Sequence, residues 1–112
     1  MIDKNEFLKK ESTNDGQSIF LFFDEFYDLY VALGLSAYYS TMVVDPYLTY
    51  SESLNQPIAF FSKGSIRIMR QSLKKVEHTP GHSYEFRTRS PIGKGGFEKW
   101  KNEVMAQHES MY

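Results

Sequence analysis

The segment from Ser18 to Leu33 restricts the fold of this chain more than any other stretch. At about 100° per residue, its large apolar side chains fall on one face of a helix and its acidic side chains on the opposite face. The apolar face holds Phe22, Phe23, Phe26, Leu29, Tyr30 and Leu33, and the acidic face holds Asp24, Glu25 and Asp28. Ser18 can cap the start and Gly34 can follow the end. The pattern therefore predicts a central amphipathic helix over 18–33.

The other elements are predicted from the spacing of apolar residues and from turn-forming residues. Helical spacing and possible caps, including Asp3, predict three further helices. Aromatic and β-branched residues, with strict alternation in the last case, predict three strands. The predicted helices span 3–10, 65–77 and 97–109, and the predicted strands span 37–44, 57–62 and 83–89. Residues 47–56 fit neither pattern, and residues 12–17 favour a loop.

The stretch 65–77 combines two periodicities. Ile66 and Ile68 suggest the alternation of a strand, whereas Ile66, Met69, Leu73 and Val76 follow a helical spacing over three turns. The longer helical pattern favours a helix that begins at Ser65. Its outer face then carries Arg67, Arg70, Gln71, Lys74 and Lys75.

Together these elements predict a single α+β domain over residues 1–112. We expect a mostly antiparallel sheet of about three strands, packed against the 18–33 and 97–109 helices, which bury their aromatic faces on it. The basic helix at 65–77 is additional. A length of 112 residues suits one domain, and no linker-like segment divides the chain.

Composition excludes several classes of site. The chain has no cysteine, which removes disulfides, thiolate metal sites and a cysteine nucleophile. No spacing typical of a zinc site, a P-loop or a serine nucleophile occurs, so we expect no metal, cofactor or catalytic residue. The N-terminal residues are of mixed charge and lack the apolar core of a signal peptide. We therefore expect a cytoplasmic protein that does not bind membranes.

Charge is sorted along the chain although the net charge is only −1. Residues 1–56 hold three basic and nine acidic side chains, whereas residues 57–112 hold ten basic and five acidic ones. Such asymmetry favours a strongly charged partner. It also permits a homo-oligomer that pairs the two halves head to tail, or neutralisation of the halves within one fold.

The basic half contains the leading candidate for a partner-binding surface. Arginine and lysine bind phosphates and carboxylates through charge and hydrogen bonds. The candidate residues are Arg67, Arg70, Lys74, Lys75, Arg87, Arg89 and Lys94. The alternative is an ordinary solvated helix face, with the arginines paired to nearby acids.

Three weaker signals carry their own alternatives. The glycine-rich residues 93–96 precede a predicted helix and can contact an anion or merely connect two elements. His78 and His82 flank the turn at 79–81 and could transfer protons in a small ribonuclease, or could be plain loop residues. The acidic stripe of 24–28 can dock a basic partner or face solvent.

The function predicted from these features is that of a small non-enzymatic binding protein. It would regulate or inhibit a larger macromolecular machine through its polarised charge, as accessory proteins of phages and plasmids do. Direct binding of nucleic acid through the basic 65–89 surface is the first alternative, and a small ribonuclease is the second. The partner is thus a protein or a nucleic acid.

Overall fold

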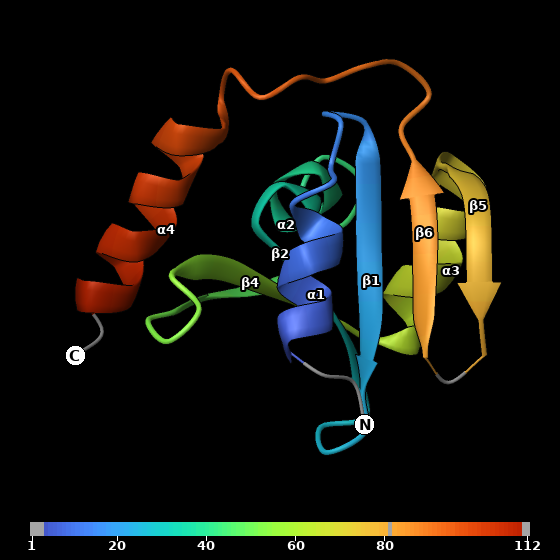
Figure 1. The fold of residues 1–112 in the computed structure, drawn as a ribbon, viewed down its shortest axis with the longest axis horizontal. Coiled ribbons are helices and arrows are strands. Elements are labelled where there is room, and N and C mark those ends of the chain that lie inside the picture. The colour runs from blue at the N-terminus through green and yellow to red at the C-terminus, as the bar shows by residue number, and fades with distance from the viewer. Residues whose placement is uncertain (1–3, 81, 111–112) are drawn as a thin grey trace.

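The computed structural model describes residues 4–80 and 82–110, so the proposed cap Asp3 lies outside the described residues. Within these residues, six strands form one antiparallel sheet with the order β3-β4-β2-β1-β6-β5 (Figure 1). The strands are β1 (Ser18–Asp24), β2 (Leu29–Leu33), β3 (Tyr47–Ser51), β4 (Gln56–Phe61), β5 (Lys74–Thr79) and β6 (Ser83–Arg87). The helices are α1 (Lys4–Glu11), α2 (Gly34–Ser40), α3 (Lys63–Ser72) and α4 (Phe97–Ser110). The α+β class is confirmed, but the sheet is twice as large as predicted.

The predicted central helix at 18–33 is wrong, because this segment forms the β1–β2 hairpin. Ile19 and Leu21 face the core, while Phe20 and Phe22 point to the opposite face, which α1 partly covers. A strand buried on both faces reads as a continuous apolar run, which hides its alternation. The Asp24 carboxylate accepts hydrogen bonds from the backbone N–H groups of Phe26 and Tyr27. The acidic residues thus mark a turn and not a helix face.

The predicted strand at 37–44 is also wrong, because its first half belongs to α2. Gly34 adopts a φ of 56°, a conformation that favours glycine and starts the helix directly after β2. Ala37 and Tyr39 are fully buried against the sheet. This burial outweighs the β-propensity of the aromatic and β-branched residues. The strand β3 lies instead within 47–56, the stretch that fitted neither pattern.

The predicted helix at 65–77 is correct only in its first part. The helix α3 is capped by Ser62, whose side chain accepts a hydrogen bond from the Ser65 N–H, and it ends at Ser72. Ile66 and Met69 are buried as the helical spacing predicts, and Leu73 is also buried. Beyond Leu73 the chain becomes β5, because an extended strand there gains a ladder of backbone hydrogen bonds with β6.

Four other predicted elements are confirmed within one or two residues at each described end: the helices at 3–10 and 97–109 and the strands at 57–62 and 83–89. The last helix was predicted to bury its aromatic face on the sheet, and it contacts β3, β4 and also α2. Val104 is buried, and Trp100 packs on Tyr38 with ring centroids 5.2 Å apart.

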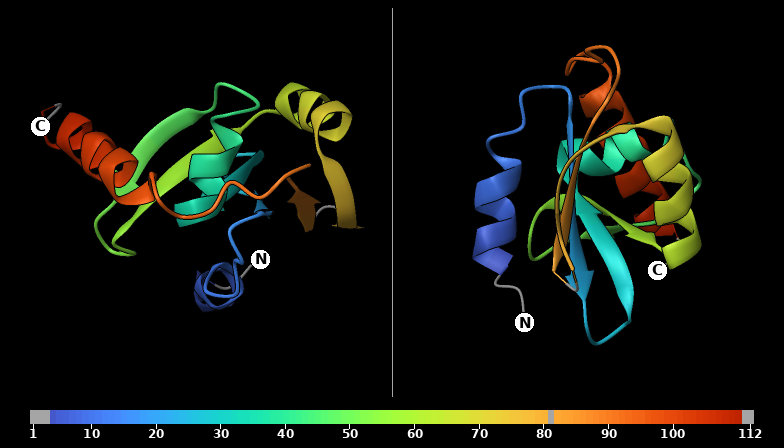
Figure 2. Two further views of the ribbon diagram at one scale, coloured as in Figure 1. Left: turned by 90° about the horizontal axis from the view of Figure 1, so that it is seen from above. Right: turned by 90° about the vertical axis from the view of Figure 1, so that its right-hand side faces the viewer.

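The helices cover the two faces of the sheet unequally (Figure 2). The helix α1 lies alone on one face, where Phe7 packs on Phe22 of β1 with ring centroids 3.6 Å apart. The helices α2 and α3 cover the other face and enclose the main core with residues such as Tyr39, Phe61 and Phe86. The helix α4 packs along the edge strand β3 and beside α2.

Candidate functional site

The two edges of the sheet differ in how they are protected. The edge strand β3 is flanked by α4, whereas β5 is the outermost strand at the other edge and has no described element beyond it (Figure 1). Nearly all residues of β5 are exposed, and its pairing with β6 is irregular between Lys75 and Glu77. An open edge offers unpaired backbone N–H and C=O groups to another chain.

Four of the seven predicted binding residues gather on the α3 side of this open edge. Arg67 and Arg70 lie one turn apart on α3, and Lys75 lies opposite Phe86 in the β5–β6 register, on the face that α3 covers. Arg89 reaches the end of α3, where its Nε donates to the carbonyl oxygen of Ser72 at 3.3 Å. We call Arg67, Arg70, Lys75 and Arg89 the α3–β5 surface. All four side chains are exposed.

Tyr84 of β6 forms the floor of this surface. The Arg70 guanidinium lies 5.1 Å from the centroid of the Tyr84 ring and donates a hydrogen bond of 2.5 Å to its hydroxyl oxygen. The His78 imidazole stacks on the same ring, with centroids 3.9 Å apart. Partial burial and the positive charges of Arg70 and Lys75 lower the pKa of His78. Arg70 and Lys75 thus add to desolvation in disfavouring the protonated form of His78.

The other three predicted residues do not join the α3–β5 surface. Lys74 and Arg87 are register partners on the opposite face of the sheet. Arg87 is held there by Asp15, whose carboxylate lies 3.1 Å from its guanidinium, and by Gln17. Partial desolvation acts against ionisation of Asp15, but hydrogen bonds and charge from Arg87 prevail and lower its pKa. Lys94 lies elsewhere, beside Glu11 and the start of α4.

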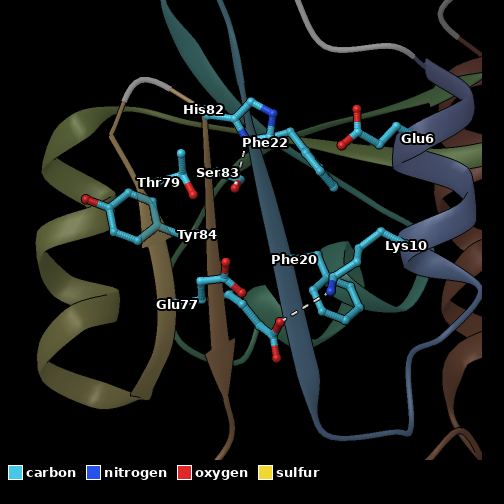
Figure 3. A pocket seen from close by; sticks show the side chains of 10 residues that line it. Glu6, Lys10, Phe20, Phe22, Glu77, Thr79, His82, Ser83 and Tyr84 are labelled. Carbon is cyan, nitrogen blue, oxygen red and sulfur yellow. Dashed lines mark hydrogen bonds and ion pairs between the residues drawn. The ribbon is translucent and has the colours of Figure 1, made fainter.

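A recess of about 200 Å³ lies on the other face, between α1 and the β6–β5 hairpin (Figure 3). Glu77 and Glu85 are direct cross-strand neighbours, a repulsive arrangement for two carboxylates. The Lys10 ammonium reduces this repulsion, because it lies 3.6 Å from Glu85 and 5.1 Å from the centroid of the Phe20 ring. The recess therefore already holds a cationic group from the chain itself.

His82 lines this recess, whereas His78 stacks on Tyr84 toward α3. The two imidazoles thus belong to opposite faces of the β5–β6 hairpin and do not converge on one point. Proton transfer between such groups and a single substrate requires both within hydrogen-bond reach. The ribonuclease hypothesis stays a prediction without geometric support.

An apolar groove of about 400 Å³ lies on the α1 face of the sheet, on the other side of α1 from the recess. Its floor consists of two cross-strand pairs, Val31 with Phe60 and Leu33 with Ile58. Phe26 and Tyr27 of the β1–β2 turn stand at one end, with exposed fractions of 85% and 60%. The sequence pattern did not reveal this groove, because the helix predicted at 18–33 buries Phe26.

Glu11 has the most perturbed pKa among the described residues. Its carboxylate accepts hydrogen bonds from the Ser36 N–H at 2.9 Å and from the Ser36 hydroxyl at 2.6 Å. Burial raises the pKa of Glu11 to about 7, although the hydrogen bonds from Ser36 and Asn14 act in the opposite sense. These bonds join the end of α1 to the first turn of α2. Glu11 is therefore a structural link and not part of the open surfaces.

The glycine-rich segment 93–96 is held by contacts within the chain. The Tyr39 hydroxyl donates to the Gly93 carbonyl oxygen at 2.6 Å, and Gly93 donates its N–H to the Gly16 carbonyl. A β-carbon at Gly96 would collide with the Tyr38 hydroxyl, so the Tyr38 side chain would have to shift. These contacts indicate that segment 93–96 connects two elements, and they favour this role over an anion-binding site.

Three further sources of functional information are a metal site, a membrane-spanning helix and similarity to known proteins. In residues 4–80 and 82–110, no group of three histidine or acidic side chains could hold a metal ion. In the same residues, no helix combines the length and the apolar composition needed to cross a membrane. Comparisons with protein families, curated proteins and solved structures find no match to this chain.

Proposed function

We propose that this protein is a non-enzymatic binding protein that captures an acidic, extended segment of a partner protein along β5. The observation that carries the proposal is the open sheet edge backed by cations from α3. Strand addition supplies affinity through main-chain hydrogen bonds, and the side chains beside the edge supply specificity. Through this contact the protein regulates or inhibits the larger assembly to which the partner belongs.

The charge of the edge selects the incoming strand. In an in-register parallel pairing of two β5 strands, Lys74 and Lys75 would lie beside the same lysines of the other copy, which costs free energy. Lysines and an irregular register are common ways of protecting an edge from pairing with further copies. An acidic strand is instead attracted by the same lysines and by Arg67 and Arg70.

A nucleic acid is the competing partner. The α3–β5 surface contains only four cations, and the opposite face of the same hairpin carries Glu77 and Glu85, which repel phosphates. Strongly salt-dependent binding of nucleic acid involves about six to ten phosphate contacts, more than four cations can supply. An open backbone edge, in contrast, has a direct use only for a protein strand. These features favour a protein.

Charge reversal tests the proposal. In pull-downs from the native host, the Arg67→Glu/Lys75→Glu variant is expected to capture about tenfold less partner than the wild type. Lys99→Glu, a single charge reversal on the exposed surface of α4, is the control for the single variant Lys75→Glu and is expected to capture as much as the wild type. Capture must survive nuclease treatment. Capture that nuclease abolishes assigns the surface to nucleic acid, and equal capture by all variants refutes the surface itself.

A further inference from the structure

The groove on the α1 face is a second surface, independent of the α3–β5 surface. Aromatic side chains there are exposed without a described partner element over them, and sheet faces of this composition are normally covered by a helix. The helix α1 packs against β1 and one side of β2, while the groove between β2 and β4 and the adjoining face of β3 have no described helix over them (Figure 2). Tyr27 and Tyr47 both pack against Phe60, with ring centroids 6.2 and 6.1 Å away, and so extend the apolar area beyond the groove floor.

We propose that this groove binds an amphipathic helix, about three turns long and with basic flanking residues, from a partner protein. A helix fits where an extended peptide does not. The sheet backbone beneath the groove is already paired on both sides of β2 and β4, so an extended peptide would bury unsatisfied backbone groups against an apolar floor. A helix satisfies its own backbone groups and presents only side chains.

The dimensions of the face agree with this occupant. The β2 strand spans five residues, or about 17 Å. A helix of about 11 residues has the same length. From β2 across β4 to β3 the sheet is about 10 Å wide, which is also the approximate diameter of a helix. The bound helix would therefore lie beside α1 and complete the layer that α1 begins.

The charge of the groove determines the polar residues of the partner. Among the described residues that line it, Asp24 and Glu25 are the only charged ones, and both lie at the turn end. Asp28, in the same turn, lies 3.7 Å from the Lys63 ammonium, and both side chains are largely exposed. An acidic or uncharged helix gains nothing at this end, whereas lysine or arginine beside the apolar stripe pairs with Asp24 and Glu25.

A displayed library of random 14-residue peptides, selected on the immobilised protein, tests this inference. We expect the enriched peptides to carry apolar residues at i, i+3, i+4 and i+7 and lysine or arginine near one end. In anisotropy titrations of these peptides, the Phe26→Ala/Tyr27→Ala variant should bind about tenfold or more weakly. Both side chains are exposed, so this variant should retain the circular dichroism spectrum of the wild type.

Charge variants complete the design. Glu25→Lys should weaken binding by about two- to fivefold, whereas Glu98→Lys, the same reversal on α4, should leave it unchanged. Several outcomes overturn the proposal: no enriched peptide, enrichment of acidic or alternating peptides, or affinities that the Phe26→Ala/Tyr27→Ala variant does not change. A dimer that dissociates on the same substitutions would identify a second copy as the occupant and also overturn it. The α3–β5 variant Lys75→Glu should bind the peptides normally, so failure here is distinguishable from failure of the proposed function.

Discussion

Replacing Glu11 by glutamine is expected to stabilise the protein by about 3 kcal/mol at pH 8 and to change its stability little at pH 5. The pKa of Glu11 rises from 4.5 in the unfolded chain to about 7 in the folded protein. Between these values the folded state holds a proton that the unfolded state has released. Its contribution to the free energy of unfolding is therefore complete below pH 4.5 and is lost as the pH rises to 7.

Glutamine keeps the shape of the side chain and removes the cost of burying a charge. Its amide oxygen can still accept from the Ser36 N–H. Its amide nitrogen can donate to the Ser36 hydroxyl oxygen in place of the Asn14 amide, because that oxygen already accepts from the Phe20 N–H as well. The measurement is urea unfolding of both proteins from pH 5 to pH 8. The lowered pKa of His78 makes a contribution of the opposite sign in this range, so the difference between the two proteins is the informative quantity. Parallel stability curves would refute a buried, protonated Glu11.

The Leu21→Ala substitution is expected to destabilise the protein by about 2–5 kcal/mol, and Phe26→Ala by less than about 0.5 kcal/mol. Leu21 is fully buried between the sheet and the helices behind it, whereas Phe26 stands at the hairpin turn with 85% of its surface exposed. The larger side chain thus matters less to folding. A helix over 18–33 predicts the reverse, because it places Phe26 on the apolar stripe and Leu21 outside it.

Urea unfolding at one pH distinguishes these two arrangements of 18–33. Since about 2–5 kcal/mol is a large part of the stability of a domain of this size, we expect a measurable fraction of Leu21→Ala to be unfolded in water. Ile19→Val removes one methylene from the same buried face and should cost about 0.5–1.5 kcal/mol. A cost for Phe26→Ala that exceeds the cost for Ile19→Val would contradict the hairpin.

Some elements were predictable because one local pattern was sufficient. The strand at 83–89 alternates between buried and half-buried positions, and it forms β6. The helix at 97–109 buries one stripe and exposes the rest, so its periodicity is visible in the sequence. In both cases one face meets the core and the other meets solvent, and binary patterning records this directly.

Other elements were not predictable because both of their faces are covered or because a distant residue decides their conformation. The β1 strand has apolar residues toward α1 as well as toward the main core. The helix α2 begins where the Glu11 carboxylate accepts from the Ser36 N–H, a contact across 25 positions of sequence. No window of local sequence contains such information.

The members of the candidate surfaces were also predictable from local sequence only in part. Arg67 and Arg70 were assigned to one surface from helical spacing, and they share it. Lys74 and Lys75 are neighbours in sequence, but in a strand successive side chains point to opposite faces, so only Lys75 joins the α3 side. Arg87 is compensated by Asp15, which lies 72 positions earlier in the chain.

The amino-acid order alone established an α+β chain with cations concentrated in its second half, since composition and simple periodicity are local properties. Tertiary structure decided which cations share a face, which sheet edge stays open and where aromatic residues meet solvent. These features depend on strand pairing and on contacts between residues far apart in the sequence. Such contacts leave no periodic signal, because their partners are separated by intervening elements of variable length.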